Sequence, residues 1–221
     1  MALVITVAQQ KGGAGKTTLA ANLAVALAMG DAKGNASRAE NGRRVALLDA
    51  DPQKSLARWQ SLRGQRGKAN IALGFAEIAG WRIGIELERV ARAHDIVVID
   101  SPPQIDTDAR QAVRAADLVL VPLQPSPPDL WAAEGTLKLA ASERRPARLV
   151  LNRAPAGAKL RTAIEGEIAA RGLPMLAAVL GNRAAFASSF ALGSSVLEAA
   201  PRSVAAAEMA ALAAEITVLA G

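Results

Sequence analysis

The chain has 221 residues, a length at which an α/β fold is commonly one domain with a sizeable core, and we expect a single domain over residues 1–221. It contains no cysteine, which excludes a disulfide framework, an iron–sulfur cluster and a zinc site built on thiolates. The formal net charge of +6 suggests a polyanionic partner, either a nucleic acid or an anionic membrane.

Apolar runs typical of buried strands alternate along the chain with segments typical of helices. Strands are expected at Leu3–Ala8, Val45–Ala50, Ile71–Phe75, Ile96–Asp100, Leu118–Pro122, Leu149–Asn152 and Met175–Leu180. Helices are expected at Thr17–Met29, Lys54–Leu62, Ile83–Ala93, Thr107–Ala115, Asp129–Ala141, Ala158–Arg171 and Pro201–Leu219. This alternation predicts an α/β fold, a doubly wound and mostly parallel sheet with helices on both faces. Ligands of such sheets bind beyond the carboxyl ends of the strands, so the residues that follow each strand are the candidates for chemistry.

The segment Gln10–Thr18 follows the first predicted strand and reads Gln-Lys-Gly-Gly-Ala-Gly-Lys-Thr-Thr. A strand that ends in glycines and leads into a helix directs backbone N–H groups at an anion. Lys16 adds a positive charge for the outer phosphates of a nucleotide, and the Thr17 hydroxyl is placed to bind Mg²⁺. The segment is therefore predicted to be a phosphate-binding loop, or P-loop.

The usual P-loop opens with a glycine, but Gln10 occupies that position here. A second lysine, Lys11, follows it at the mouth of the loop. A lysine there points away from its own nucleotide, so a natural use is to reach a phosphate held by another subunit. Residues 11–18 closely resemble the deviant Walker A motif of the ParA/MinD family of ATPases. The resemblance implies a P-loop NTPase with ATP and Mg²⁺ as cofactors and with Lys11 and Lys16 as catalytic residues. The implied nucleotide contacts are Gly12, Gly13, Ala14, Gly15, Lys16, Thr17 and Thr18.

The connection 30–44, between the first helix and the second strand, is long for a helix-to-strand turn. We expect a flexible surface loop within the domain. Docking of a partner or contact with DNA is an open alternative, because long loops are often functional.

Asp49 and Asp51 stand where the second predicted strand ends. They are two residues apart and therefore point to the same side. They resemble the Walker A′ segment of the family, which implies that Asp51 orients or activates the attacking water and that Asp49 helps to hold magnesium. The alternative is an ordinary strand end where aspartate begins a turn.

The run Ile96–Asp100 is a Walker B pattern, in which a buried strand fixes an aspartate that holds Mg²⁺ through a water. The following Asp-Ser-Pro-Pro is similar to the Asp-Thr-Pro-Pro of many ParA proteins, where this loop senses the γ-phosphate. The predicted metal-binding residues are thus Thr17, Asp49 and Asp100.

Two further stretches resemble the family. The proline-rich segment 121–129 is similar to one that small ParA proteins of the ParF type place near their dimer interface, although a surface loop with a half-buried Trp131 is the alternative. Asn152, at the end of a strand, falls at the adenine-recognition position, and its amide can match an adenine edge, although asparagine is also a routine turn residue there. Pro201 falls where the family often packs a loop against the base. His94, the only histidine, is expected to be structural.

The distribution of basic residues favours DNA over a membrane. Residues 203–221 contain two glutamates and no lysine or arginine, which is unsuitable for a basic amphipathic membrane anchor. Basic residues concentrate before that segment, and phosphate contacts from lysine and arginine suffice for nonspecific duplex binding. The segment Gly181–Arg183 resembles a place where several ParA proteins keep a DNA-contacting arginine. Our candidates for DNA binding are Arg183 first, then Arg171, Lys159 and Arg161.

Taken with the resemblance, the sequence predicts a weakly active ATPase that forms an ATP-dependent homodimer and binds nonspecific double-stranded DNA in the ATP state. Its cargo would be a plasmid, a chromosome or a protein assembly such as a carboxysome, and a ParB-like or adaptor protein would stimulate hydrolysis. Without a signal peptide or a membrane span in the sequence, we expect it in the cytoplasm, on the nucleoid. The alternatives are a MinD-like switch on a membrane surface and an ATP-dependent small-molecule ligase of the same fold.

Overall fold

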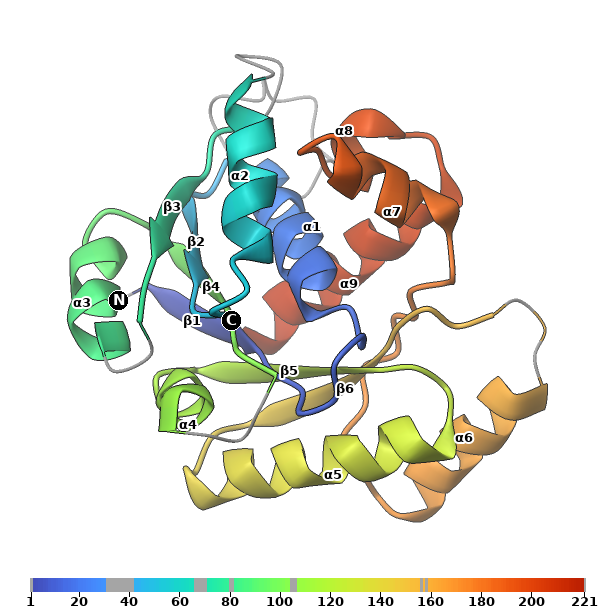
Figure 1. Ribbon diagram of the computed structural model, residues 1–221. Coiled ribbons are helices and arrows are strands. Elements are labelled where there is room, and N and C mark those ends of the chain that lie inside the picture. The colour runs from blue at the N-terminus through green and yellow to red at the C-terminus, as the bar shows by residue number, and fades with distance from the viewer. Residues whose placement is uncertain are drawn as a thin grey trace.

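A computed structural model describes residues 2–30, 42–65, 71–79, 82–103, 107–155, 157 and 159–220. Six strands form one sheet in the order β3-β2-β4-β1-β5-β6 (Figure 1). They are β1 (Leu3–Val7), β2 (Val45–Asp49), β3 (Gly74–Glu77), β4 (Ile96–Asp100), β5 (Leu118–Leu123) and β6 (Ala147–Leu151). Every neighbouring pair is parallel, so the carboxyl ends of all six strands lie at one end of the sheet.

Helices cover both faces of the sheet, which confirms the predicted doubly wound α/β fold. One face carries α1 (Lys16–Met29), α2 (Ser55–Gln65), α7 (Ala184–Ala191), α8 (Val196–Ala199) and α9 (Val204–Ala220). The other carries α3 (Ile83–Ala91), α4 (Thr107–Arg114), α5 (Pro127–Ser142) and α6 (Lys159–Ala170). In the described part of the chain, no helix combines the length and the apolar character needed to cross a bilayer.

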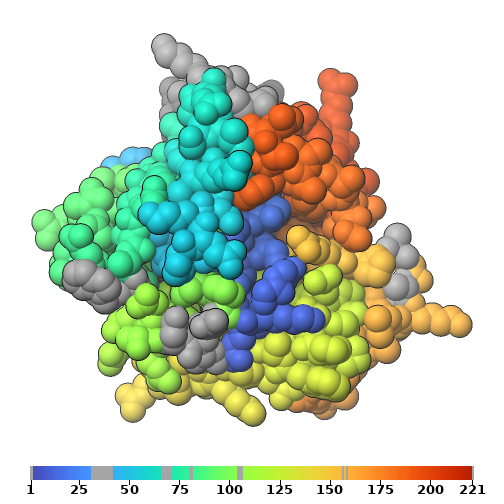
Figure 2. Space-filling model, in the orientation of Figure 1, coloured from blue at the N-terminus to red at the C-terminus, as the bar shows by residue number. Residues whose placement is uncertain are grey.

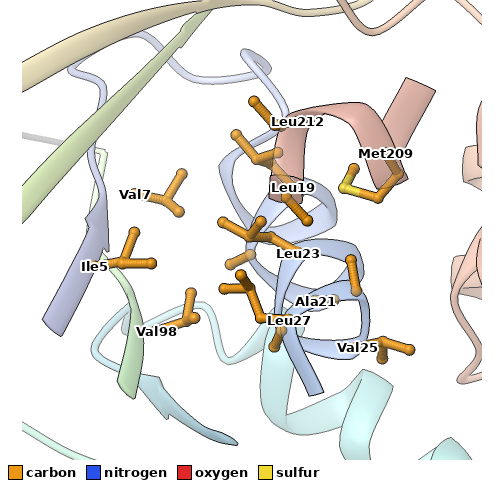
Figure 3. Close-up of a cluster of buried hydrophobic side chains, with 14 of the residues drawn as sticks. Ile5, Val7, Leu19, Ala21, Leu23, Val25, Leu27, Val98, Met209 and Leu212 are labelled. Carbon is orange, nitrogen blue, oxygen red and sulfur yellow. The ribbon is translucent and has the colours of Figure 1, made fainter. Parts of the chain in front are cut away.

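Helix α1 is the centre of the larger core. Its side chains Leu19, Leu23 and Leu27 point at the sheet, where Ile5 and Val98 receive them (Figure 3). The opposite side of α1 packs against α9, and the alanines of both helices let the two backbones approach closely. Burial on all sides explains why α1 is apolar around its whole circumference. The start of this helix, which holds the P-loop, is therefore fixed in position.

The predicted seventh strand, Met175–Leu180, is wrong. This segment runs beside β6 but forms only isolated bridges, of Met175 with Leu149 and of Gly181 with Ala154. Between them the N–H groups of Ala177 and Ala178 donate to the carboxylate of Glu215 on α9, at 2.8 and 2.9 Å. Because these donors serve a side chain, a continuous ladder cannot form.

Other boundaries also differ from the predictions. Strand β3 begins at Gly74, not at Ile71, and α9 begins at Val204, not at Pro201. The Ser203 hydroxyl accepts a hydrogen bond from the N–H of Ala206, so Ser203 begins the helix in the way that serine commonly does. Helices α7 and α8 were not predicted. Most of the expected 30–44 loop, residues 31–41, lies outside the described residues.

A buried ion pair joins α2 to α8. The guanidinium of Arg63 bonds the carboxylate of Glu198 at 2.6 Å, and the two side chains are only 4% and 7% exposed. Burial acts to raise the pKa of Glu198, but Arg63 and the N–H groups of Ser195 and Ile71 outweigh it, so the pKa is lowered. Arg63 also lies over the ring of Trp59, and the turn at Gly193 closes against the backbone of Arg63.

The close approach at Gly193 leads to a prediction about stability. Gly193 has a φ of +66°, and an added Cβ would lie 2.3 Å from the backbone nitrogen of Arg63, so Gly193→Ala combines backbone strain with a collision. We expect it to lower the free energy of unfolding by about 3 kcal/mol or more in denaturant titration. Gly172→Ala is the matched control, because Gly172 has a φ of +61° but nothing within 4 Å of an added Cβ. That control should cost only about 1–2 kcal/mol, and equal losses would contradict the role given to the contact.

Candidate nucleotide-binding site

The P-loop connects β1 to α1 at the carboxyl end of the sheet. Gly13 and Gly15 adopt positive φ values of 81° and 86°, which turn the loop tightly enough to aim its N–H groups inward. Lys16 is buried, and its Nζ donates to the carbonyl of Gln9 across the loop at 3.1 Å. Burial lowers the pKa of Lys16, while Asp100 and Asp51 act in the opposite direction. The loop thus holds a desolvated cation at the carboxyl end of the sheet.

Asp100, close to Lys16 and Thr17 of this loop, has its carboxyl group buried. It is fully buried, and neither of its oxygens has a hydrogen-bond partner within the described residues. Burial raises its pKa to about 7; the nearby Thr17 hydroxyl and Lys16 oppose the rise, and Asp49 and Asp51 add to it. Although Thr17 is close enough to act on the charge, the oxygens lack a well-formed hydrogen bond. A partnerless buried carboxyl group next to a threonine hydroxyl suits a hard cation such as Mg²⁺.

Asp49 is the residue opposite Asp100 on the neighbouring strand β2. Its two oxygens accept from the N–H groups of Asp51 and Ala57, at 3.1 and 2.8 Å, so the carboxylate also fixes the start of α2. Burial raises the pKa of Asp49, and these two hydrogen bonds oppose the rise. Asp51 accepts from the N–H of Gln53 at 2.9 Å.

Two neighbouring cavities open at this end of the molecule. The smaller, of about 260 Å³, is lined by the phosphate-binding candidates Gly12, Gly13, Gly15, Lys16, Thr17 and Thr18 and by Asp51. The larger, of about 540 Å³, shares Thr18, Arg153 and Phe190 with it. In Figure 2 the blue N-terminal segment that contains the P-loop reaches the surface between the cyan α2 and the orange C-terminal helices. The pair of cavities suits a nucleotide, with phosphates in the smaller and a base in the larger.

Asn152 lines the larger cavity, but both ends of its amide already have partners. The nitrogen donates to the carbonyl of Ala14 at 2.8 Å, and the oxygen accepts from the N–H of Arg153 at 3.0 Å. A Cβ on Gly15 would lie 2.6 Å from the Asn152 nitrogen, so the P-loop and Asn152 fit closely. Pro201 is exposed and is not among the lining residues of either cavity.

Three residues that sequence reasoning missed belong to the site. Arg153, with a φ of +51°, donates to the carbonyl of Gly13 at 3.1 Å and lines both cavities. Phe190 lines both cavities and stacks on Trp59, with ring centroids 6.1 Å apart. Asp129, in the first turn of α5, pairs with Lys11. The positively charged Arg153 directly after Asn152 was the available signal, whereas nothing in the sequence around Phe190 indicated a site.

Lys11 forms an ion pair within its own chain. Its Nζ lies 2.5 Å from Oδ2 of Asp129, in the first turn of α5, and this carboxylate is nearly buried. The Ser126 hydroxyl donates to the same oxygen. Lys11 is not among the residues that line the smaller cavity.

Three of the four DNA-binding candidates are engaged with carboxylates. Arg183 bonds Glu208 at 2.7 Å and lines the larger cavity. Arg171 bonds Glu134 at 2.8 Å and Glu167 at 3.2 Å, and Arg161 bonds Glu165 at 2.8 Å. Lys159 is exposed at the start of α6.

Comparison with known proteins identifies the family of this chain. A family model described as the CobQ/CobB/MinD/ParA nucleotide binding domain matches residues 5–196. The chain is 30% identical to the maintenance of carboxysome distribution protein A of Halothiobacillus neapolitanus, covering 94% of this chain and 92% of that protein. It is 29% identical to the chromosome-partitioning ATPase Soj of Thermus thermophilus over 62% of this chain and 60% of that protein.

Solved structures share the fold. The cell division ATPase MinD of Pyrococcus furiosus superimposes with a TM-score of 0.76 at 21% identity, over 100% of both chains. A McdA–ATP complex from Cyanothece superimposes with a TM-score of 0.74 at 15% identity, over 99% of this chain and 96% of that one. The chain therefore belongs to the CobQ/CobB/MinD/ParA nucleotide-binding domain family, whose ParA and MinD members are ATPases.

Proposed function

We propose that this protein is an ATPase that dimerises with ATP, binds nonspecific duplex DNA in that state and positions a cargo in the cell. The observation that carries the nucleotide chemistry is the buried, partnerless Asp100 beside Thr17 and Lys16. The similarity to a carboxysome distribution protein and to partition ATPases supports the positioning of a cargo. The cytoplasm and the nucleoid surface are the proposed location.

Each residue of the site has a proposed role. The amides of the loop from Gly12 to Gly15 and the ammonium of Lys16 bind the β- and γ-phosphates. Mg²⁺, held by the Thr17 hydroxyl and through water by Asp100, would neutralise charge on the phosphates when bound. Asp49 positions the start of α2 and would help to hold Mg²⁺ when the ion is bound. Asp51, on the wall of the phosphate cavity, orients the water whose oxygen bonds to the γ-phosphorus as the bond to ADP breaks.

The base is assigned to the larger cavity. Asn152 holds the P-loop through Ala14 and lines the cavity, so its proposed part is to position the loop as well as to contact adenine. Phe190, from α7, gives an aromatic wall at the junction of the two cavities. Pro201 remains a candidate for contact with the base, although it does not line the cavity in this chain alone.

Lys11 is proposed to act on the phosphates of a second subunit. In the single chain it is held by Asp129, so the ion pair must open before the lysine can cross an interface. Hydrolysis removes the phosphate that such a lysine contacts, which would release the dimer and its DNA. A partner protein that stimulates hydrolysis would set the timing, because Arg153, the arginine that lines the phosphate cavity among the described residues, is bonded to the carbonyl of Gly13.

A membrane-surface switch is the second candidate. Against it, the C-terminal helix α9 packs along α1, and its apolar residues Ala205, Met209, Leu212 and Ile216 are buried in the core. A helix engaged in this way is unavailable as an amphipathic anchor. A ligase is the third candidate, and the second lysine of the loop argues against it.

The first prediction about function concerns the nucleotide dependence of DNA binding. Anisotropy of a labelled random-sequence duplex should rise on addition of protein with Mg²⁺ and ATP, and not with ADP or without nucleotide. The affinity should fall steeply with salt, because phosphate contacts release counterions. Equal binding in all three nucleotide states would contradict the ATP switch, and binding only to anionic vesicles would favour the membrane candidate.

The second prediction concerns Asp51. Asp51→Asn keeps the size of the side chain but removes the charge that orients the water, so ATP turnover should fall by about 100-fold or more. Binding of a fluorescent ATP analogue should stay within about threefold, because the phosphate donors are unchanged. Gln53→Ala, on the same cavity wall, is the control and should leave turnover nearly unchanged. Normal phosphate release by the Asp51 variant would remove this residue from the catalytic role.

The third prediction concerns Lys11. Lys11→Ala should retain ATP binding but abolish the ATP-dependent increase in mass seen by light scattering, since the contact across the interface is lost. Lys138→Ala is the matched control, because Lys138 is an exposed lysine on α5. An ATP-dependent dimer of the Lys11 variant would refute the assignment in trans.

A further inference from the structure

The two cavities of the candidate site meet at Thr18, Arg153 and Phe190, which line both of them. A nucleotide with its phosphates in the smaller cavity and its base in the larger must cross between the cavities at these residues. Only the ribose separates the base of a nucleotide from its first phosphate, so the base must lie close to the same junction. The side chains at the junction are therefore well placed to select the base.

The polar side chains around the larger cavity are largely engaged within the protein. Asn152 uses both ends of its amide for bonds to neighbouring backbone groups. The guanidinium of Arg153 donates to the carbonyl of Gly13, and that of Arg183 bonds Glu208. Besides alanines, the apolar side chains of the wall are those of Leu19, Leu180, Phe186, Phe190 and Met209. Such a wall favours recognition of a base through its ring face more than through hydrogen bonds to its edge.

The ring of Phe190 is held in place by a second aromatic ring. It stacks on Trp59, with the ring centroids 6.1 Å apart and the planes inclined by 22°. Trp59 is 1% exposed, and its indole N–H donates to the carbonyl of Ser194 at 3.3 Å. The guanidinium of Arg63 lies 5.1 Å from the centroid of the Trp59 ring and is itself bonded to Glu198. Phe190 is thus oriented before a ligand binds, which lowers the entropic cost of stacking on it.

We propose that Phe190 is the surface on which the base stacks and that it makes the site selective for purine nucleotides. This assignment rests on the nucleotide binding proposed above. A purine has two fused rings and covers more of an aromatic face than the single ring of a pyrimidine, so stacking favours ATP over CTP. Because every base offers a ring face, stacking alone discriminates little between adenine and guanine. The second N–H and the second lone pair of the Asn152 amide are left for that choice.

Phe186, one helical turn before Phe190 on α7, is the matched comparison. It lines the larger cavity but is not among the lining residues of the smaller one. The stacked ring pair of the described residues, Trp59 with Phe190, does not include it. Replacing Phe186 should therefore alter the cavity wall away from the junction and leave the proposed stack on the base in place.

The test compares Phe190→Leu with Phe186→Leu in the full-length protein. Leucine keeps an apolar side chain at each position and removes the ring, whereas Phe190→Tyr keeps the ring. Dissociation constants of ATP, GTP and CTP are measured with Mg²⁺ by calorimetry. Inorganic tripolyphosphate, which has no base, is titrated into the same samples to report on the phosphate cavity alone.

We expect the wild type to bind ATP about tenfold or more tightly than CTP, with GTP closer to ATP than to CTP. Phe190→Leu should weaken ATP binding by about tenfold and CTP binding by no more than about threefold, so that the preference for the purine falls. The ATP-to-GTP ratio and the affinity for tripolyphosphate should stay within about threefold, because neither depends on the stack. Phe186→Leu and Phe190→Tyr should both keep the preference of the wild type for ATP over CTP.

Equal binding of ATP and CTP by the wild type would overturn the assignment. An unchanged preference in Phe190→Leu, or an equal fall in Phe186→Leu, would overturn it as well. If Phe190→Leu loses tripolyphosphate binding, Phe190→Met is the second ring-free variant and is judged by the same ratios. Failure of the proposed function looks different, because the wild type would then bind neither ATP nor tripolyphosphate.

Discussion

The burial of α1 between the sheet and α9 is the constraint on which the rest of the structure depends. It fixes the P-loop at its helical end, while Asn152 and Arg153 hold the carbonyls of Ala14 and Gly13 within the loop. It also reaches the opposite wall of the site: the side chain of the buried Asn22 accepts from the N–H of Val196 at 2.8 Å and so holds α8. Through Glu198 and Arg63, α8 in turn holds α2, which begins just after Asp51. One helix thus sets the relative positions of the P-loop and of the carboxylates of Asp49 and Asp51 before α2.

The two ends of the sheet differ in how deeply their charged side chains are buried. At the carboxyl end, Lys16, Asp49 and Asp100 are buried at a cost that a bound nucleotide and cation would offset. At the amino end, arginines such as Arg44, Arg110 and Arg114 remain more than half exposed, so their charges stay in water, where they cost little. The first arrangement favours a small ligand that enters a fixed cleft.

The parts of the site that could be predicted from the sequence are those formed by residues close together in the chain. The P-loop, Asp49 with Asp51 and Asp100 are each specified by a strand and the few residues after it, so the parallel sheet brings them together. Contacts between distant residues could not be predicted, since Lys11 and Asp129 are 118 positions apart. Helix α7 was missed because its alanines, serines and phenylalanines have no clear period. The capping box of Ser195 and Glu198 was a signal for α8 that was overlooked. The extended segment after Met175 was mistaken for a strand, because Glu215, which takes the N–H group of Ala177 from a sheet ladder, lies on another helix.

The ion pair of Lys11 with Asp129 has a consequence for how reversible an assembly of this protein would be. If the lysine moves to a phosphate of a second subunit, one salt link replaces another, and the net gain is the small difference between two large terms. Because such an exchange leaves the number of charge contacts nearly constant, its equilibrium depends little on ionic strength. Contact with DNA, in contrast, creates charge pairs outright and weakens steeply with salt. The two associations would therefore respond to separate cues, nucleotide state for one and ionic conditions for the other.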